Sequence, residues 1–263
     1  MIKLENITFK YDKIIIDNIN LNISKSKVTF IIGTNGSGKS TLASIISGLL
    51  YPISGKLSID DLIINKKTDN KLIRNKVGIV FQNPSNQIIF SKVYDDLKFT
   101  LENIKIEKTL IPEIIKDSLK KVNMENFVNA NPYELSGGEQ QRIAIASQLS
   151  LNPDYLILDE ATSMIDINGK QEIYKLISSL KKKIGIIFIT NNMDELIYAD
   201  EVVIIDNHKT YKYEINDILN NNTVLTNHHL QIPFIFKLAT TLKINNIDDL
   251  NEKSILERIN KND

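Results

Sequence analysis

Two runs near the amino terminus alternate apolar and polar residues, from Ile2 to Phe9 and from Ile14 to Ile23, on either side of the turn Tyr11-Asp12-Lys13. A period of two is typical of a strand with one buried face, so the pattern predicts a β-hairpin. A continuous apolar run from Val28 to Ile32 then leads through a glycine-rich loop into a helical pattern from Ser40 to Leu50. The chain therefore begins with a predicted hairpin, followed by strand, loop and helix.

The middle of the chain changes from strand to helix periodicity. Short strands are predicted between Gly55 and Ile64, and a buried strand from Val77 to Phe81. Between Pro84 and Leu149 the period becomes helical, most clearly at Ile111 to Val122 and at Glu139 to Leu151. This pattern indicates a helical unit inserted between strands.

Strand patterns return at Tyr155 to Leu158, at Ile184 to Ile189 and at Val202 to Ile205, with a helical pattern from Gly169 to Leu180 between the first two. Strands that alternate with helices predict a mostly parallel sheet covered on both faces.

The carboxyl-terminal segment from about Asn216 is polar and helical. Short apolar clusters occur in it at Ile232 to Leu242 and at Ile255 to Ile259. This segment is either a small appended domain or a docking tail.

Composition narrows the classes of function. The 263 residues contain 32 Lys+Arg, 32 Asp+Glu and no Cys. The balanced charge provides no overall attraction to nucleic acid, so we expect no nucleic-acid partner. The lack of Cys excludes disulfides and thiolate catalysis, and it favours a cytoplasmic protein. The amino terminus lacks the pattern of a secretory signal, and no apolar run approaches the roughly 20 residues that cross a bilayer.

The glycine-rich loop matches the phosphate-binding P-loop pattern in full, because a strand precedes it and a helix follows it. Glycines let backbone amides approach phosphate oxygens, and a helix start adds its positive dipole end. Lys39 is placed to reach the terminal phosphates, and the Ser40 hydroxyl to bind Mg²⁺. The alternative is a plain glycine-rich turn. The predicted nucleotide-binding residues here are Gly33, Thr34, Asn35, Gly36, Ser37, Gly38, Lys39, Ser40 and Thr41.

Two acids follow the strand from Tyr155 to Leu158, at the end of a parallel strand where such sheets bind ligands. We expect Asp159 to hold Mg²⁺ through water and Glu160 to act as the general base on an attacking water. The alternative for either residue is a capping acid.

The segment Leu135 to Arg142, with the letters LSGGEQQR, lies at the start of a predicted helix. Ser136 alone would cap this helix, but Gly137 and Gly138 also let an anion approach the backbone. With a second phosphate-binding element present, the sequence resembles the ATP-binding cassette (ABC) ATPases from about residue 1 to 215.

The resemblance implies an α/β P-loop NTPase fold. It contains a mostly parallel sheet, an N-terminal antiparallel β subdomain, an inserted helical subdomain and a small helical C-terminal extension. We place the ABC ATPase domain at 1–215, its helical subdomain at about 84–150, and the extension at 216–263, where it is expected to contact a partner.

The resemblance also implies roles for three further residues. Tyr11 matches the aromatic residue that stacks on adenine, the alternative being cross-strand packing. Gln82 matches the glutamine that contacts Mg²⁺ and the attacking water, the alternative being a turn residue. Asp166 matches an acid that reaches across a dimer interface, the alternative being a helix N-cap.

In the ABC ATPases, the segment that Leu135 to Arg142 matches is the family signature, and we call it the signature segment. Family logic implies a head-to-tail dimer with a second ABC ATPase subunit, either a paralogue or a second copy. In this dimer, ATP and Mg²⁺ bind between the P-loop of one subunit and the signature segment of the other. Several segments resemble the cassettes of energy-coupling factor (ECF) importers, which take up vitamins or metal ions. These segments are Phe81 to Gln87, Asp95 to Leu97, Leu101 to Asn103, Glu160 to Met164, and Ile232 to Phe234 with Leu238, Ala239 and Leu242. Asn35 and Asn83-Pro84 are more similar to the first of the two paralogous cassettes. This resemblance implies a peripheral subunit on the cytoplasmic face of the membrane, with an integral membrane coupling subunit and a substrate-binding membrane subunit as partners.

One position departs from the family pattern. Where the family has a switch histidine, after the strand from Ile184 to Ile189, this chain has Asn191. The three histidines lie downstream, at positions 208, 228 and 229, where surface roles are expected. Asn191 keeps open a regulatory nucleotide-binding subunit with little turnover, and a soluble ABC ATPase outside transport is a second alternative.

Overall fold

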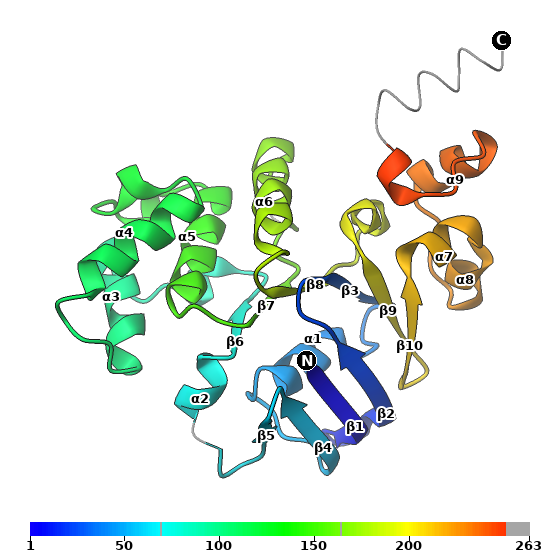
Figure 1. The fold of residues 1–263 in the computed structure, drawn as a ribbon, viewed down its shortest axis with the longest axis horizontal. Helices are drawn as coiled ribbons and strands as arrows, with labels where there is room; N and C mark the ends of the chain where they lie inside the picture. The colour runs from blue at the N-terminus through cyan, green and yellow to red at the C-terminus, as the bar shows by residue number, and fades with distance from the viewer. Residues whose placement is uncertain (69, 164, 251–263) are drawn as a thin grey trace.

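Two β-sheets organise the chain, as Figure 1 shows for the computed structural model, which describes residues 1–68, 70–163 and 165–250. The four-stranded antiparallel sheet has the order β2-β1-β4-β5, and the six-stranded sheet has the order β10-β9-β3-β8-β7-β6. In the larger sheet, β10 is the antiparallel edge strand and the others run parallel. The strands are β1 (Ile2–Lys10), β2 (Ile14–Ile23), β3 (Val28–Gly33), β4 (Ser54–Ile59), β5 (Leu62–Ile64), β6 (Val77–Val80), β7 (Tyr155–Asp159), β8 (Gly185–Ile189), β9 (Glu201–Asp206) and β10 (Lys209–Glu214).

Two groups of helices flank the larger sheet. In Figure 1, α3 to α5 form a helical unit on the left, and α7 to α9 form the extension on the right. The helices are α1 (Lys39–Ile46), α2 (Asn70–Arg74), α3 (Val93–Asn103), α4 (Ile111–Lys121), α5 (Gly137–Ser150), α6 (Ile167–Leu180), α7 (Ile215–Asn220), α8 (Thr223–Asn227) and α9 (Phe234–Thr241). Single 3-10 turns lie at Pro84–Asn86, Glu125–Phe127, Pro132–Glu134, Met193–Tyr198 and Ile247–Asp249.

The larger sheet separates two hydrophobic cores, because successive side chains of a strand point to opposite faces. Phe30 of β3 packs in the core shared with the helical unit, where its ring stacks on Phe188 with centroids 4.9 Å apart. Its neighbour Ile31 packs in the other core, together with α1 and the antiparallel sheet. The P-loop strand is therefore buried on both faces, which fixes the loop that follows it.

The fold class predicted from the sequence is confirmed, including the hairpin, whose register pairs Ile2 with Ile23 and Lys10 with Ile14. One helix is shorter than predicted: α1 ends at Ile46, because Gly48 has a φ of 73° and a β-carbon there would lie 2.7 Å from Ile73 Cδ1. Strand β10 was not predicted, since none of its side chains is buried and its period-two pattern is limited to Tyr211 and Tyr213. The expected cluster at Ile255 to Ile259 lies outside the described residues.

Candidate functional site

The P-loop joins β3 to α1 with a backbone that only glycine accommodates. A β-carbon at Gly33 would lie 2.5 Å from the carbonyl oxygen of Ile205 on β9. Gly38 has a φ of 105° and precedes α1 without a side-chain cap. The first amides of a helix have no partner within it, so the start of α1 is open to phosphate oxygens.

Lys39 is held inside this loop. Its Nζ donates to the carbonyl oxygens of Gly33 at 2.9 Å and Thr34 at 3.1 Å. Burial lowers the pKa of Lys39, while the nearby charges of Glu160 and Asp159 raise it. The two carbonyl oxygens are uncharged acceptors. The charged oxygens of a bound phosphate would form stronger hydrogen bonds with the Lys39 ammonium.

Asp159, at the end of β7, has the chemistry of a cation ligand. It is 7% exposed, and its Oδ1 has no hydrogen-bond partner among the described residues. Burial raises its pKa, and the hydrogen bond from Ser40 and the charge of Lys39 act against this increase. An orphaned carboxylate oxygen beside a hydroxyl suits Mg²⁺, which prefers oxygen ligands, so Asp159 and Ser40 fit the predicted metal role.

Glu160 is held by two amides from separate segments. Gln82 Nε2 donates to Glu160 Oε2 at 2.8 Å, and Asn191 Nδ2 donates to Oε1. The Glu160 backbone has a φ of 50°, a left-handed conformation that costs about 1–3 kcal/mol outside glycine and persists where the surroundings enforce it. The structure thus brings the predicted base, Glu160, together with Gln82, which was predicted to contact the attacking water, and with Asn191, which occupies the switch position. Glu160 and Asn191 line a cavity at the P-loop, and Gln82 contacts Glu160.

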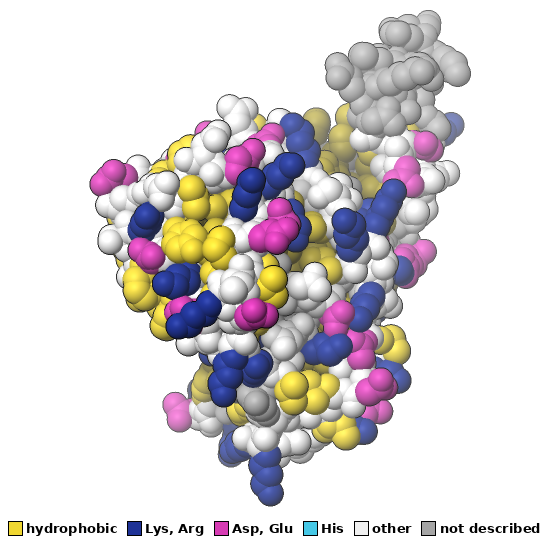
Figure 2. Space-filling model, turned by 60° about the vertical axis from the view of Figure 1, so that its left-hand side comes forward, with side chains coloured by type: hydrophobic (Ala, Val, Ile, Leu, Met, Phe, Trp, Pro, Cys, Tyr) yellow, Lys and Arg dark blue, Asp and Glu magenta, His cyan; other side chains and the backbone are white. Residues whose placement is uncertain are grey.

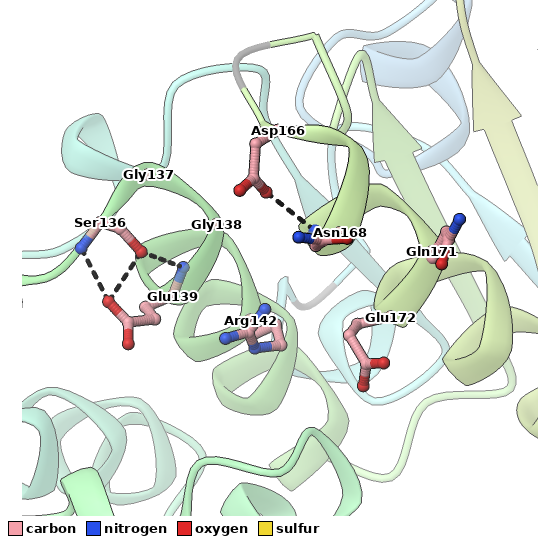
Figure 3. A pocket seen from close by; sticks show the side chains of 10 residues that line it. Ser136, Gly137, Gly138, Glu139, Arg142, Asp166, Asn168, Gln171 and Glu172 are labelled. Carbon is pink, nitrogen blue, oxygen red and sulfur yellow. Dashed lines mark hydrogen bonds between the residues drawn. The ribbon is translucent and has the colours of Figure 1, made fainter.

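A second cavity, of about 650 Å³, lies at the signature segment (Figure 3). Ser136 caps α5, and its hydroxyl and backbone amide both donate to Glu139, at 2.7 and 2.9 Å. Gly137 and Gly138 line this cavity from α5, and Asp166 lines it from the start of α6. Asp166 also caps α6 through the Gly169 amide at 2.8 Å, so the alternative role considered for it is present.

The two cavities share no lining residue. The P-loop cavity, about 320 Å³, is lined by Ile15, Asn35, Gly36, Gly38, Lys39, Ser40, Thr41, Glu160 and Asn191. The signature cavity is lined only by residues between Ser136 and Glu172. A single chain therefore presents two separate cavities, one at the P-loop and one at the signature segment.

Comparison with known proteins decides the family. Residues 16–163, more than half of the chain, match the family model described as ABC transporter. The energy-coupling factor transporter ATP-binding protein EcfA1 of Mesomycoplasma hyopneumoniae strain 7448 is 40% identical over 251 residues, covering 93% of this chain and 92% of that protein. EcfA1 of Mycoplasmopsis pulmonis is 41% identical over 268 residues, covering 99% of this chain and all of that protein (100%). The chain belongs to the ECF group of ABC ATPases.

Solved structures agree with this membership. The cbiO1 structure from Clostridium perfringens, described as part of the ABC transporter complex cbiONQ, has a TM-score of 0.78, is 32% identical, and covers 91% of this ABC ATPase and 98% of that chain. The cassette MJ0796, solved as a dimer bound to ADP and Pi, has a TM-score of 0.73, is 28% identical, and covers 82% and 99%. No helix among the described residues of this ABC ATPase is long and apolar enough to span a membrane.

One residue that lines the P-loop cavity of this ABC ATPase was not predicted from the sequence. Tyr11 is 57% exposed and packs edge-on against Phe9, with ring centroids 5.0 Å apart, but Ile15 of β2 lines the P-loop cavity instead. Nothing in the local pattern marks Ile15 as a site residue. Adenine stacking by Tyr11 stays a prediction.

None of the three histidines lines the P-loop cavity, although His229 lines a neighbouring cavity together with Asn191 and Gly33. His208 and His229 are exposed, as expected. His228 is not a surface residue: its side chain is 12% exposed, and its Nδ1 lies 2.9 Å from Asp206 Oδ2. The surface expectation for His228 is wrong because α8 packs it against the β9–β10 hairpin, with its ring 4.5 Å from that of Tyr211.

Proposed function

We propose that this ECF ABC ATPase hydrolyses ATP at its own P-loop with Glu160 as the general base. The observation that supports this role is the position of Glu160 beside the P-loop, with one amide on each carboxylate oxygen. Two donors fix a carboxylate in one orientation, which favours the positioning of a water molecule for attack.

The other residues divide the remaining tasks. Lys39 and the backbone amides from Gly33 to Thr41 would neutralise the negative charge of the phosphates. Asn191 would donate a hydrogen bond toward the phosphoryl group that is being transferred. Ser40, Asp159 and Gln82 would hold Mg²⁺, which supplies charge stabilisation to the phosphates when bound. Tyr11 would stack on adenine from the turn between β1 and β2.

The two separate cavities support a head-to-tail dimer. Ser136, Gly137, Gly138 and Asp166 would act on the nucleotide in the P-loop of a second ABC ATPase subunit, either a paralogue or a second copy. The dimer of the related cassette supports this arrangement. The boundary between an ATPase domain at 1–215 and an extension at 216–263 remains part of this proposal.

A groove between α2–β6 and the helical unit is proposed as the seat of an integral membrane coupling subunit. It has a volume of about 790 Å³ and is lined by apolar side chains that include Tyr51, Ile73, Ile79, Ile89, Phe99 and Ile104. Ile89 is 63% exposed, and hydrophobic side chains gather over the helical unit on the face turned forward in Figure 2. An apolar groove of this kind fits one face of a helix. Together with a separate substrate-binding membrane subunit, such a partner supports our proposal that the chain is a peripheral subunit at the cytoplasmic face, for uptake of a vitamin or metal ion.

The base assignment is tested in the assembled complex by replacing Glu160 with Gln. We expect Glu160→Gln to bind MgATP with near-parental affinity, to stop phosphate release, and to hold the dimer closed. Lys39→Ala is the contrasting variant, because loss of the ammonium weakens binding in the ground state as well. Unchanged phosphate release by Glu160→Gln would remove Glu160 as the base.

A second candidate function is a regulatory nucleotide-binding subunit with little turnover. Asn191, in place of the expected histidine, is the observation that favours it. Steady-state phosphate release at this chain's P-loop site separates the two functions.

A further inference from the structure

Glu195 is a buried carboxylate that none of the roles above uses. It lies on the 3-10 turn Met193–Tyr198, four residues after Asn191, and is 3% exposed. Its Oε1 accepts hydrogen bonds from Thr162 Oγ1 and from the Tyr174 hydroxyl, both at 2.7 Å. Its Oε2 has no partner among the residues that the structure describes. Burial of a carboxylate is costly unless it is well bonded, so this arrangement calls for a functional account.

Thr162 connects this carboxylate to the candidate base. It lies in the turn that follows Glu160, where the Ser163 amide donates to the Glu160 carbonyl oxygen at 3.0 Å. The Glu160 amide in turn donates to the carbonyl oxygen of Ile189 at 2.9 Å. The segment that bears Glu160 is thus joined to the segment that bears Asn191 through the backbone at one end and through Thr162 and Glu195 at the other.

The exposed hydrogen bond between Asn191 and Glu160 lies between the backbone bond to Ile189 and the Thr162–Glu195 bond. Gln82 and Asn191 are both exposed side chains, so their amides orient the Glu160 carboxylate but do not by themselves fix the turn that bears it. The Glu195–Thr162 bond is buried, whereas the bonds from Gln82 and Asn191 are exposed, which makes it the stiffer constraint on that turn.

We propose that Glu195 is a positioning residue for ATP hydrolysis. By holding Thr162, it keeps the turn after β7 in the shape that places Glu160 in its left-handed conformation between Gln82 and Asn191. Glu195 does not touch the nucleotide. The inference rests on the proposed function, because it takes Glu160 as the base.

Tyr174 provides a matched control for this role. Its hydroxyl donates to the same oxygen as Thr162, but it comes from α6 and not from the turn that bears Glu160. Its ring stacks on Tyr198 with centroids 3.9 Å apart, a contact that Phe retains. Tyr174→Phe and Thr162→Val each remove one hydroxyl from Glu195 and preserve the shape of the side chain.

The test measures single-site ATP turnover in the complete complex, with the partner's P-loop site disabled. A misplacement of about 1 Å can cost on the order of 100-fold in rate, and Gln82 and Asn191 still hold Glu160, so we expect Thr162→Val to lower kcat about tenfold at unchanged KM. Tyr174→Phe should leave kcat within about twofold, although both variants lower the thermal midpoint. Thr162→Ser, which keeps the hydroxyl, should retain the parental kcat.

Equal kcat values for Thr162→Val and Tyr174→Phe would overturn the inference, because a purely structural bond affects both variants alike. A loss of kcat in Thr162→Ser as large as in Thr162→Val would also overturn it, since packing and not the hydroxyl would then be responsible. Should Thr162→Val not fold, Glu195→Gln against Glu195→Ala gives the same answer. Gln can still accept from Thr162, so kcat should be higher in Glu195→Gln than in Glu195→Ala, and equal kcat values would contradict the role.

Glu160→Gln in the same complex separates this inference from the function on which it rests. Continued turnover in Glu160→Gln would reject the base assignment and the positioning role together. Loss of turnover there, with equal kcat values in Thr162→Val and Tyr174→Phe, would reject the positioning role alone.

Discussion

Replacement of Asn191 should reveal how much the amide beside Glu160 contributes to hydrolysis. In the structure, Asn191 Nδ2 donates to Glu160 Oε1, and both side chains are accessible to solvent. A hydrogen bond to a charged group is worth about 1.5–3 kcal/mol, and exposure favours the lower end of that range. Since about 1.4 kcal/mol corresponds to a factor of ten in rate, we expect Asn191→Ala to lower kcat about tenfold.

We expect Asn191→His to change kcat in the opposite direction. A histidine ring is longer than an asparagine side chain and can reach the γ-phosphate with an N–H while it holds water and the neighbouring acids in register. We therefore expect Asn191→His to raise kcat above the parental value, with the KM for ATP nearly unchanged in both variants. The assay is single-site turnover in the complete complex with the partner's P-loop site disabled.

One control variant bounds this prediction. Asn192→Ala changes the adjacent exposed asparagine, which caps the 3-10 helix and makes no bond to Glu160 among the residues that the structure describes, so its kcat should fall less than that of Asn191→Ala. The reasoning is refuted when Asn191→Ala turns over at the parental rate, because the amide then holds no group that matters. A kcat in Asn191→His no higher than in the parent would show that asparagine substitutes adequately.

Three further predictions concern the signature, the metal ligand and the extension. Gly138→Leu should leave ATP binding to the isolated chain intact but prevent dimer closure, since Gly138 lines the signature cavity and even a β-carbon there would lie 3.1 Å from Ile165 Cγ2; lost binding in the monomer would contradict action on the partner's nucleotide. Burial raises the pKa of Asp159, so the contribution of this residue to stability is present at low pH and is lost as the pH rises through that raised pKa. Asp159→Asn should therefore raise the thermal midpoint at pH 7 while it weakens Mg²⁺-dependent ATP binding. An unchanged midpoint would argue against a costly burial of the charged carboxylate. Phe234 is 73% exposed at the start of α9, whereas Phe236 is fully buried. Phe234→Ala should therefore weaken association with the partner cassette, measured by sedimentation, at unchanged stability, whereas Phe236→Ala should cost about 3–5 kcal/mol of unfolding free energy, measured by chemical denaturation. The converse pattern would refute docking by the extension.

The parts of the site that the sequence predicted are those that local backbone chemistry dictates. The P-loop needs glycine at Gly33 and Gly38 whatever surrounds it, and Asp159 and Glu160 must appear where a buried strand ends. Such features are visible in one short stretch of sequence, and the same is true of the hairpin, with its alternation of period two.

The parts that escaped prediction depend on the packing of distant segments. Ile15 reaches the P-loop cavity only because the antiparallel sheet packs against α1. The bonds from Glu195 to Thr162 and Tyr174 join three segments that are 12 to 33 residues apart, and no motif marks their meeting. His228 was misjudged for the same reason, since its partner Asp206 is 22 residues away.

The separation of the two cavities also bears on how such a gene can evolve. Each nucleotide would be enclosed by the P-loop of one chain and the signature segment of another, so a substitution at Asn191 alters one site and a substitution at Gly138 alters the other. In the proposed dimer with a paralogue, a single gene would therefore contribute to two active sites that selection can tune independently. If the partner is a paralogue, one site can lose turnover while the other retains it, and a chain with an asparagine at the switch position can persist in a working transporter.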